Sequence, residues 1–137
     1  MEVMGLTKSA KTNASFIGDS RLTSILLGVV LAYCISLVVF VFSSLLFTLT
    51  PLTEAIMPYI TYITTVISIF IGGIYTAGKI GYKGWLNGGI CGLIYLIGLF
   101  ILSLLLNVNV VFGLQLLSRI VLSFLIGAIG GILGINM

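Results

Sequence analysis

Long apolar runs alternate with short polar segments along this chain. Residues 22–49, 55–78, 85–106 and 120–137 contain no Asp, Glu, Lys, Arg or His. A helix crosses the roughly 30 Å hydrocarbon core of a bilayer with about 20 apolar residues. The pattern therefore predicts an all-α polytopic membrane protein, a four-transmembrane-helix bundle, with the last span covering about residues 117–136.

Two prolines mark predicted helix boundaries. Thr50-Pro51 should end the first helix, because proline cannot continue the hydrogen-bond ladder and disfavours helix at the residue before it. Pro58 lies where the second helix should begin, and a missing N–H costs little in an opening turn. We therefore interpret Pro58 as a helix start and not as a functional kink.

The chain divides into an N-terminal segment and a membrane domain. Residues 1–21 are polar, and we expect a flexible or surface-lying cytoplasmic segment before a transmembrane domain over residues 22–137. A basic segment before an apolar run is also typical of a cleaved signal peptide. The run is too long for that role and no small-x-small cleavage site follows it, so we expect a retained membrane anchor.

The composition excludes a soluble domain. Hydrophobic residues make up 60% of the chain and charged residues 7%, with a mean hydropathy of +1.33. The net charge of +3 is small and lies beside the predicted spans. It indicates membrane topology and contact with anionic lipid, and we expect no nucleic-acid partner.

Basic residues predict the orientation of the spans. Lys8, Lys11 and Arg21 precede the first span, and Lys79 and Lys83 lie between the second and the third. The other two connections contain no Lys or Arg over residues 50–54 and 107–110. By the positive-inside rule, both termini and the middle loop should be cytoplasmic.

Three residues should anchor the cytoplasmic turn at the membrane surface. Lys79 and Lys83 suit contact with lipid headgroups, and Trp85 suits the interfacial aromatic belt. The glycine spacing around them lacks the order and the strand-to-helix context of a phosphate-binding loop, so a tight turn is the simpler interpretation.

Small residues recur at four-residue spacing in all four predicted helices. Residues four apart share a helix face, where small side chains let helix backbones approach closely in a membrane. The predicted helix-packing glycines are Gly28, Gly72, Gly73, Gly84, Gly88, Gly92, Gly127, Gly130, Gly131 and Gly134.

These glycines lie mainly in the predicted cytoplasmic half, while the outer half carries bulkier residues such as Leu45, Phe47 and Leu105. We therefore expect a bundle that is tight toward the cytoplasm and wider toward the outside. Packing within one chain is the simpler use of the glycine faces. The alternative is a seam for a homo-oligomer or a larger membrane complex.

Glu54 and Arg119 are the charged residues of the predicted outer side. Arg119 lies 18 positions before Met137, about 27 Å along a helix, which places it near the outer interface. It could form an ion pair with Glu54, extend unpaired to water, or belong to a translocation site.

The residues of common enzyme sites are missing from the sequence. There is no histidine, and the acidic residues are Glu2, Asp19 and Glu54, none of them central in a span. Carboxylate-pair catalysis and histidine-activated nucleophiles lack their parts. We therefore predict no catalytic, cofactor-binding or metal site, no cofactor and no enzymatic activity.

Glycine-rich motifs around the second and third helices and at the C-terminus carry a resemblance. The chain resembles a family of small four-span membrane proteins of unknown function from Gram-positive bacteria. The resemblance implies a multi-pass protein of the bacterial cytoplasmic membrane and carries over no activity. The motif residues are Gly72-Gly73, Gly78-Lys79, Gly84-Trp85-Leu86-Asn87-Gly88, Gly92, Tyr95 and Gly130-Gly131-Ile132-Leu133-Gly134-Ile135-Asn136.

Two functions remain open at this point. The first is a non-enzymatic membrane component that packs with itself or a larger complex through its Gly/Ser faces. The second is a small transporter or channel, because Thr61, Thr65 and Ser68 form a polar line on the second helix. Small multidrug exporters have a similar size, but they rely on a glutamate in the first helix that this chain lacks.

Overall fold

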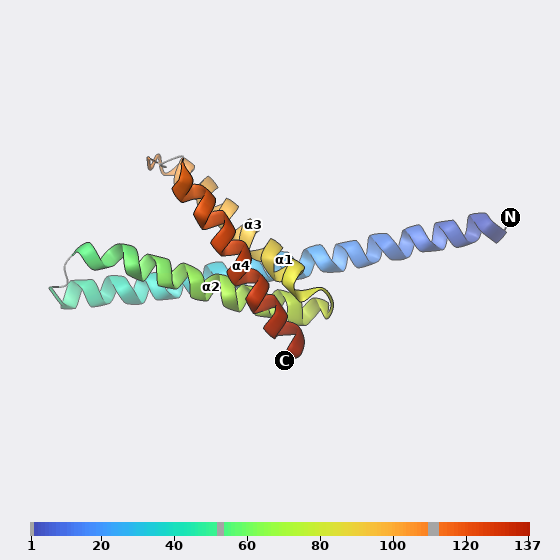
Figure 1. Ribbon diagram of the computed structural model, residues 1–137, viewed down its shortest axis with the longest axis horizontal. Coiled ribbons are helices and arrows are strands. Elements are labelled where there is room, and N and C mark those ends of the chain that lie inside the picture. The colour runs from blue at the N-terminus through green and yellow to red at the C-terminus, as the bar shows by residue number, and fades with distance from the viewer. Residues whose placement is uncertain (1, 52–53, 110–112) are drawn as a thin grey trace.

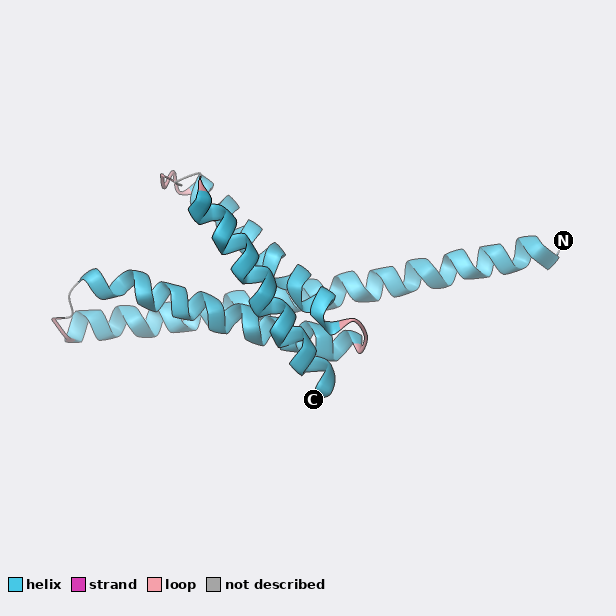
Figure 2. Ribbon diagram, viewed as in Figure 1, coloured by secondary structure: helices cyan, strands magenta, loops and turns pink. Residues whose placement is uncertain are grey.

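The computed structural model describes the backbone of residues 2–51, 54–109 and 113–137, and the side chains within these ranges from Asp19 onward. In this part of the chain every regular element is a helix (Figure 2). The elements are α1 (Glu2–Leu49), a short 3-10 helix η1 (Glu54–Ile56), α2 (Met57–Ile80), α3 (Gly84–Leu105) and α4 (Leu114–Asn136).

Each of the four long helices contains a stretch that is long and apolar enough to cross a membrane. These stretches are Asp19–Leu49, Glu54–Ile80, Gly84–Leu105 and Leu114–Asn136. The prediction of four apolar helices is therefore confirmed. Their boundaries differ from the predicted ones by a few residues, as expected where helix ends fray.

The helix boundaries follow local chemistry. Helix α1 ends at Leu49, just before Thr50-Pro51, and Pro58 lies in the first turn of α2, as predicted. Helix α2 ends where Gly81 adopts a left-handed conformation with φ of 78°, and its N–H donates to the Ala77 carbonyl at 2.8 Å. Lys83, with φ of 44°, completes the turn into α3.

The N-terminal segment is helical, whereas a flexible segment was one of the two expectations. Helix α1 continues back to Glu2, and its first part projects away from the other helices (Figure 1). Residues 2–18 add about 25 Å of helix before the apolar stretch. No proline interrupts this segment, so the helix of the span can extend through it. Met1 and the side chains of residues 2–18 lie outside the described part.

The helices form two antiparallel hairpins, α1–α2 and α3–α4, which diverge from a common end (Figure 1). We call the end that holds the α2–α3 turn and the C-terminus the closed end. The end that holds the α1–α2 and α3–α4 connections is the open end. The taper predicted from the small and bulky residues is present, and the open end is the one predicted to lie outside.

Helices α2 and α3 each contact the other three long helices, whereas α1 and α4 share no contact among the described residues. Ala32, Ile69 and Tyr95 form a buried cluster where α1, α2 and α3 meet. Tyr33 extends this cluster, and its hydroxyl donates to the Tyr95 carbonyl at 2.9 Å. Most large apolar side chains point outward instead, as a lipid-facing surface requires.

Candidate functional site

Glycines bring the backbones of α3 and α4 into direct contact at the closed end. A Cβ added to Gly84 would meet the Gly131 carbonyl, and one added to Gly88 would meet the Gly127 carbonyl. Gly92 packs in the same way against Ser123, where an added Cβ would lie 2.5 Å from the carbonyl oxygen. Because the neighbouring atoms are backbone, a side chain at these glycines could not be accommodated by a rotamer change.

Close backbone contacts at glycines also pack α4 and α1 against α2. A Cβ on Gly73 would lie 2.8 Å from the Gly127 carbonyl oxygen, and one on Gly72 would lie 2.9 Å from that of Gly28. The structure places every predicted helix-packing glycine against another helix of the same chain: Gly28, Gly72, Gly73, Gly84, Gly88, Gly92, Gly127, Gly130, Gly131 and Gly134.

Three further glycines pack closely but are not among the predicted helix-packing glycines. Gly78 lies against Gly134, Gly89 against the Phe124 ring and Gly98 against the Tyr33 hydroxyl. Gly89 and Gly98 do not continue a four-residue repeat of small residues, so spacing could not have found them. Their partners come from distant segments, and only the fold brings them together.

A polar cluster fastens α1 to the α2–α3 turn at the closed end. The Arg21 Nε donates to the Asn87 side-chain oxygen at 2.8 Å, and the Asn87 amide nitrogen donates to the Tyr82 carbonyl at 2.7 Å. The Arg21 guanidinium also lies 5.9 Å from the centre of the Tyr82 ring. Asn87 is fully buried, and both its amide oxygen and its amide nitrogen have a hydrogen-bond partner, as buried polar groups require.

The three predicted cytoplasmic anchors lie at the same end. Lys79, Lys83 and Trp85 are all exposed around the α2–α3 turn. The Lys79 Nζ donates to the Tyr75 hydroxyl at 3.3 Å and lies 5.5 Å from the Tyr75 ring centre. This places basic and aromatic side chains side by side, as membrane-surface contact requires.

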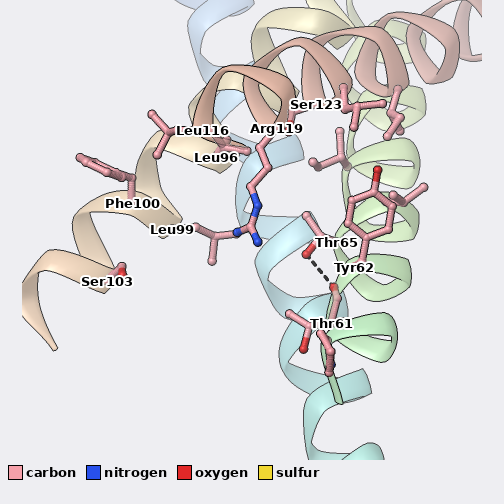
Figure 3. Close-up of a pocket in the computed structure, with 15 residues that line it drawn as sticks. Thr61, Tyr62, Thr65, Leu96, Leu99, Phe100, Ser103, Leu116, Arg119 and Ser123 are labelled. Carbon is pink, nitrogen blue, oxygen red and sulfur yellow. Dashed lines mark hydrogen bonds between the residues drawn. The ribbon is translucent and has the colours of Figure 1, made fainter. Parts of the chain in front are cut away.

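A cleft of about 420 Å³ separates the hairpins in the open half of the molecule. Its walls come from α2, α3 and α4 (Figure 3). This volume falls within the range of small-molecule sites, which runs from about 300 to 1,000 Å³. We call it the inter-hairpin cleft. Its lining residues are Pro58, Thr61, Tyr62, Thr65, Val66, Ile69, Leu96, Leu99, Phe100, Ser103, Leu116, Arg119, Leu122, Ser123 and Ile126.

Among the described residues that line this cleft, Arg119 is the one with a charged side chain. It extends from α4 toward Leu99 of α3 and Thr65 of α2 (Figure 3). Glu54, its candidate ion-pair partner, is exposed in η1 before α2. Within the described ranges, no ion pair joins the two residues in this structure.

The predicted polar line on α2 divides between two environments. Thr61 and Thr65 line the inter-hairpin cleft, whereas Ser68 is fully buried. The Thr61 hydroxyl donates to the Met57 carbonyl at 3.0 Å and the Thr65 hydroxyl to the Thr61 carbonyl at 2.9 Å. Both hydroxyl protons are therefore used within α2, which leaves oxygen lone pairs facing the cleft.

The comparisons with known proteins place the chain in a family. Residues 21–134 match the family described as "Protein of unknown function (DUF3792)". The chain belongs to this family. No curated protein and no solved structure matches the chain. Membership in DUF3792 brings no activity with it, so a function has to be argued from the geometry of the helices.

Proposed function

We propose that this protein is a non-enzymatic component of the bacterial cytoplasmic membrane that holds another membrane molecule in its inter-hairpin cleft. The proposed orientation has both termini and the α2–α3 turn in the cytoplasm. The observation that carries the proposal is the cleft, a mostly apolar space that the side chains of the described residues leave unfilled.

The glycine contacts support a binding role by making the closed end rigid. Close backbone packing fixes the two hairpins relative to each other at the closed end, and the hairpins diverge toward the open end (Figure 1). Because the glycine faces are used within one chain, they are not free as a seam for a partner. We therefore propose the cleft, and not the Gly/Ser faces, as the surface that meets another molecule.

Photo-crosslinking in native membranes tests this proposal. A photoreactive amino acid replaces Leu99, which lines the cleft, and in a matched variant it replaces Ile97, which is 55% exposed on α3 and does not line the cleft. We expect position 99 to capture one defined molecule, identified by mass spectrometry, and position 97 to capture mixed bulk lipid. Identical products from both positions would contradict the proposal.

A small transporter or channel is the second candidate. It is favoured by the Thr61 and Thr65 oxygens, which share the cleft with Arg119. Against it, the backbone contacts of α4 with α2 and α3 close the way toward the closed end, so conduction would require the helices to separate. Solute flux in proteoliposomes that disappears in Thr65→Leu would place transport ahead of static binding.

A further inference from the structure

The cleft combines apolar walls with one cation. Val66, Leu96 and Ile126 contribute hydrocarbon surface, and Arg119 contributes a guanidinium. The Arg119 side chain makes no hydrogen bond or ion pair in the described part of the chain, and Asp19 and Glu54 are not among the residues that line the cleft. The cleft therefore carries an uncompensated positive charge beside a surface that favours an acyl chain.

The depth of Arg119 matches that of a lipid phosphate. Helix α4 has 23 residues and spans about 34 Å, slightly more than the roughly 30 Å hydrocarbon core. Arg119 lies about 7.5 Å from the first residue of α4, Leu114, measured along the helix. If the helix spans the bilayer, this places the guanidinium near the boundary between acyl chains and headgroups. The other basic side chains described, Arg21, Lys79 and Lys83, lie at the closed end.

The donors in the cleft distinguish among ligands. Thr61 and Thr65 already donate to their own helix, and the other hydroxyls in the lining, those of Tyr62, Ser103 and Ser123, offer one donor each. The guanidinium of Arg119 therefore offers the largest set of donors in the cleft. A guanidinium presents these N–H groups as a planar fork that matches the oxygens of a phosphate. Free phosphate would leave the apolar walls unused. A zwitterionic lipid such as phosphatidylethanolamine would offer the same phosphate but would also bring an ammonium group near the guanidinium, which repels it, so a lipid with net negative charge fits the cleft better.

We propose that the inter-hairpin cleft binds one anionic phospholipid, with its phosphate on Arg119 and an acyl chain between α2 and the α3–α4 hairpin. This inference rests on the proposed function, because it names the molecule that the cleft holds. Arg119 sets the preference for an anionic headgroup. The apolar residues deeper in the cleft bind the chain without regard to the headgroup.

Native mass spectrometry of the full-length protein tests the inference. The protein is released from nanodiscs that contain equal amounts of phosphatidylglycerol and phosphatidylethanolamine with the same acyl chains. We expect one retained phosphatidylglycerol per chain. Arg119→Gln should lower the retention of both lipids, because both carry the phosphate, and should lower the ratio of retained phosphatidylglycerol to phosphatidylethanolamine roughly threefold. Arg119→Lys should have an intermediate effect, since it keeps the charge but loses the fork.

Two matched controls separate this site from general lipid contact. Lys79→Gln removes a basic side chain at the closed end, which we expect to contact headgroups of the other leaflet, and should change the ratio less than Arg119→Gln does. Ser103→Trp should fill the cleft and release lipid of either kind, whereas Leu104→Trp, at a 54% exposed neighbour on α3, should not. All variants are first checked for wild-type elution and helical content.

The outcomes distinguish the inference from the proposed function. Equal retention of both lipids by the wild type, or the same ratio in Arg119→Gln, would overturn the anionic assignment. If Ser103→Trp still releases a bound molecule in that case, the cleft remains a binding site. Two results would show that the occupant is not a lipid. One is a dimer in native mass spectrometry that disappears in Ser103→Trp. The other is the capture of a protein by the photoreactive amino acid at position 99. If Ser103→Trp and Leu104→Trp behave alike, no molecule occupies the cleft and both proposals fail.

Discussion

The same four helices pack closely at the closed end of this molecule and diverge at the open end. At the closed end, glycine opposes glycine and the helix backbones touch, as at Gly88 and Gly127. At the open end, large side chains such as Leu104 and Leu105 point outward, and the hairpins diverge around a cleft. The difference shows how four similar apolar helices acquire a rigid part and an accessible part.

The physical reason lies in how helices associate in lipid. Apolar side chains gain little by moving from lipid to protein, so bulk hydrophobicity does not draw the helices together. Close van der Waals contact and interhelical hydrogen bonds draw helices together instead. Close contact requires small side chains, and hydrogen bonds require matched polar groups. The closed end has both, in its glycine contacts and in the Arg21–Asn87 pair.

The largest expected effect comes from a single methyl group at the closed end. Gly131→Ala would place a Cβ against the Gly84 carbonyl and 3.1 Å from the Gly88 Cα, all backbone atoms. Because backbone cannot move aside locally, we expect a loss of about 3 kcal/mol or more in the free energy of unfolding. Unfolding of the purified protein in detergent or bicelles, monitored by circular dichroism, measures the loss.

The matched control for this substitution is Gly113→Ala. An added Cβ at Gly113 meets no atom within 4 Å, and its φ of 172° is extended backbone that any residue adopts. Its stability should equal that of the wild type within about 0.5 kcal/mol. Equal stability of both variants would show that the α3–α4 contact is looser than described.

An intermediate effect is expected at the polar cluster. Asn87→Ala removes the acceptor for Arg21 and the donor to the Tyr82 carbonyl, both in a buried position. We expect a loss of about 2 kcal/mol in the free energy of unfolding, the usual cost of losing a hydrogen bond to a charged group. The same unfolding measurement applies.

The control for Asn87 is Thr48→Val in α1. The Thr48 hydroxyl is exposed and donates within its own helix, to the Ser44 carbonyl. A loss as large as that of Asn87→Ala would mean that any polar substitution destabilises the fold. In that case the Arg21–Asn87 pair would have no special role in fastening α1.

The smallest effect is expected at the open end. Leu105 is 80% exposed, so its side chain mainly contacts lipid. In Leu105→Ala the shorter side chain still contacts lipid, and little contact between helices is lost. We expect a change below about 0.5 kcal/mol in the free energy of unfolding. A loss comparable to that of Gly131→Ala would show that a further surface packs on this residue and would remove the contrast between the two ends.

The sequence by itself determined the elements and their class. Charge-free runs of about the length of a bilayer crossing or more indicated four apolar helices. Thr50-Pro51 and Pro58 located two of their ends, because the covalent geometry of proline acts locally. The four-residue spacing of glycines indicated the faces on which helix backbones can approach. These features depend on residues close together in the chain.

Only the tertiary structure decided which faces meet and what lies between them. Four glycine faces allow many pairings, and spacing alone could not choose contact within the chain over an oligomer seam. Asn87 meets Arg21 and Gly98 meets Tyr33 across more than 60 residues of sequence. The place of Arg119 in a cleft, away from Glu54, follows from the divergence of two hairpins. That divergence is a property of the packed helices and of no single segment.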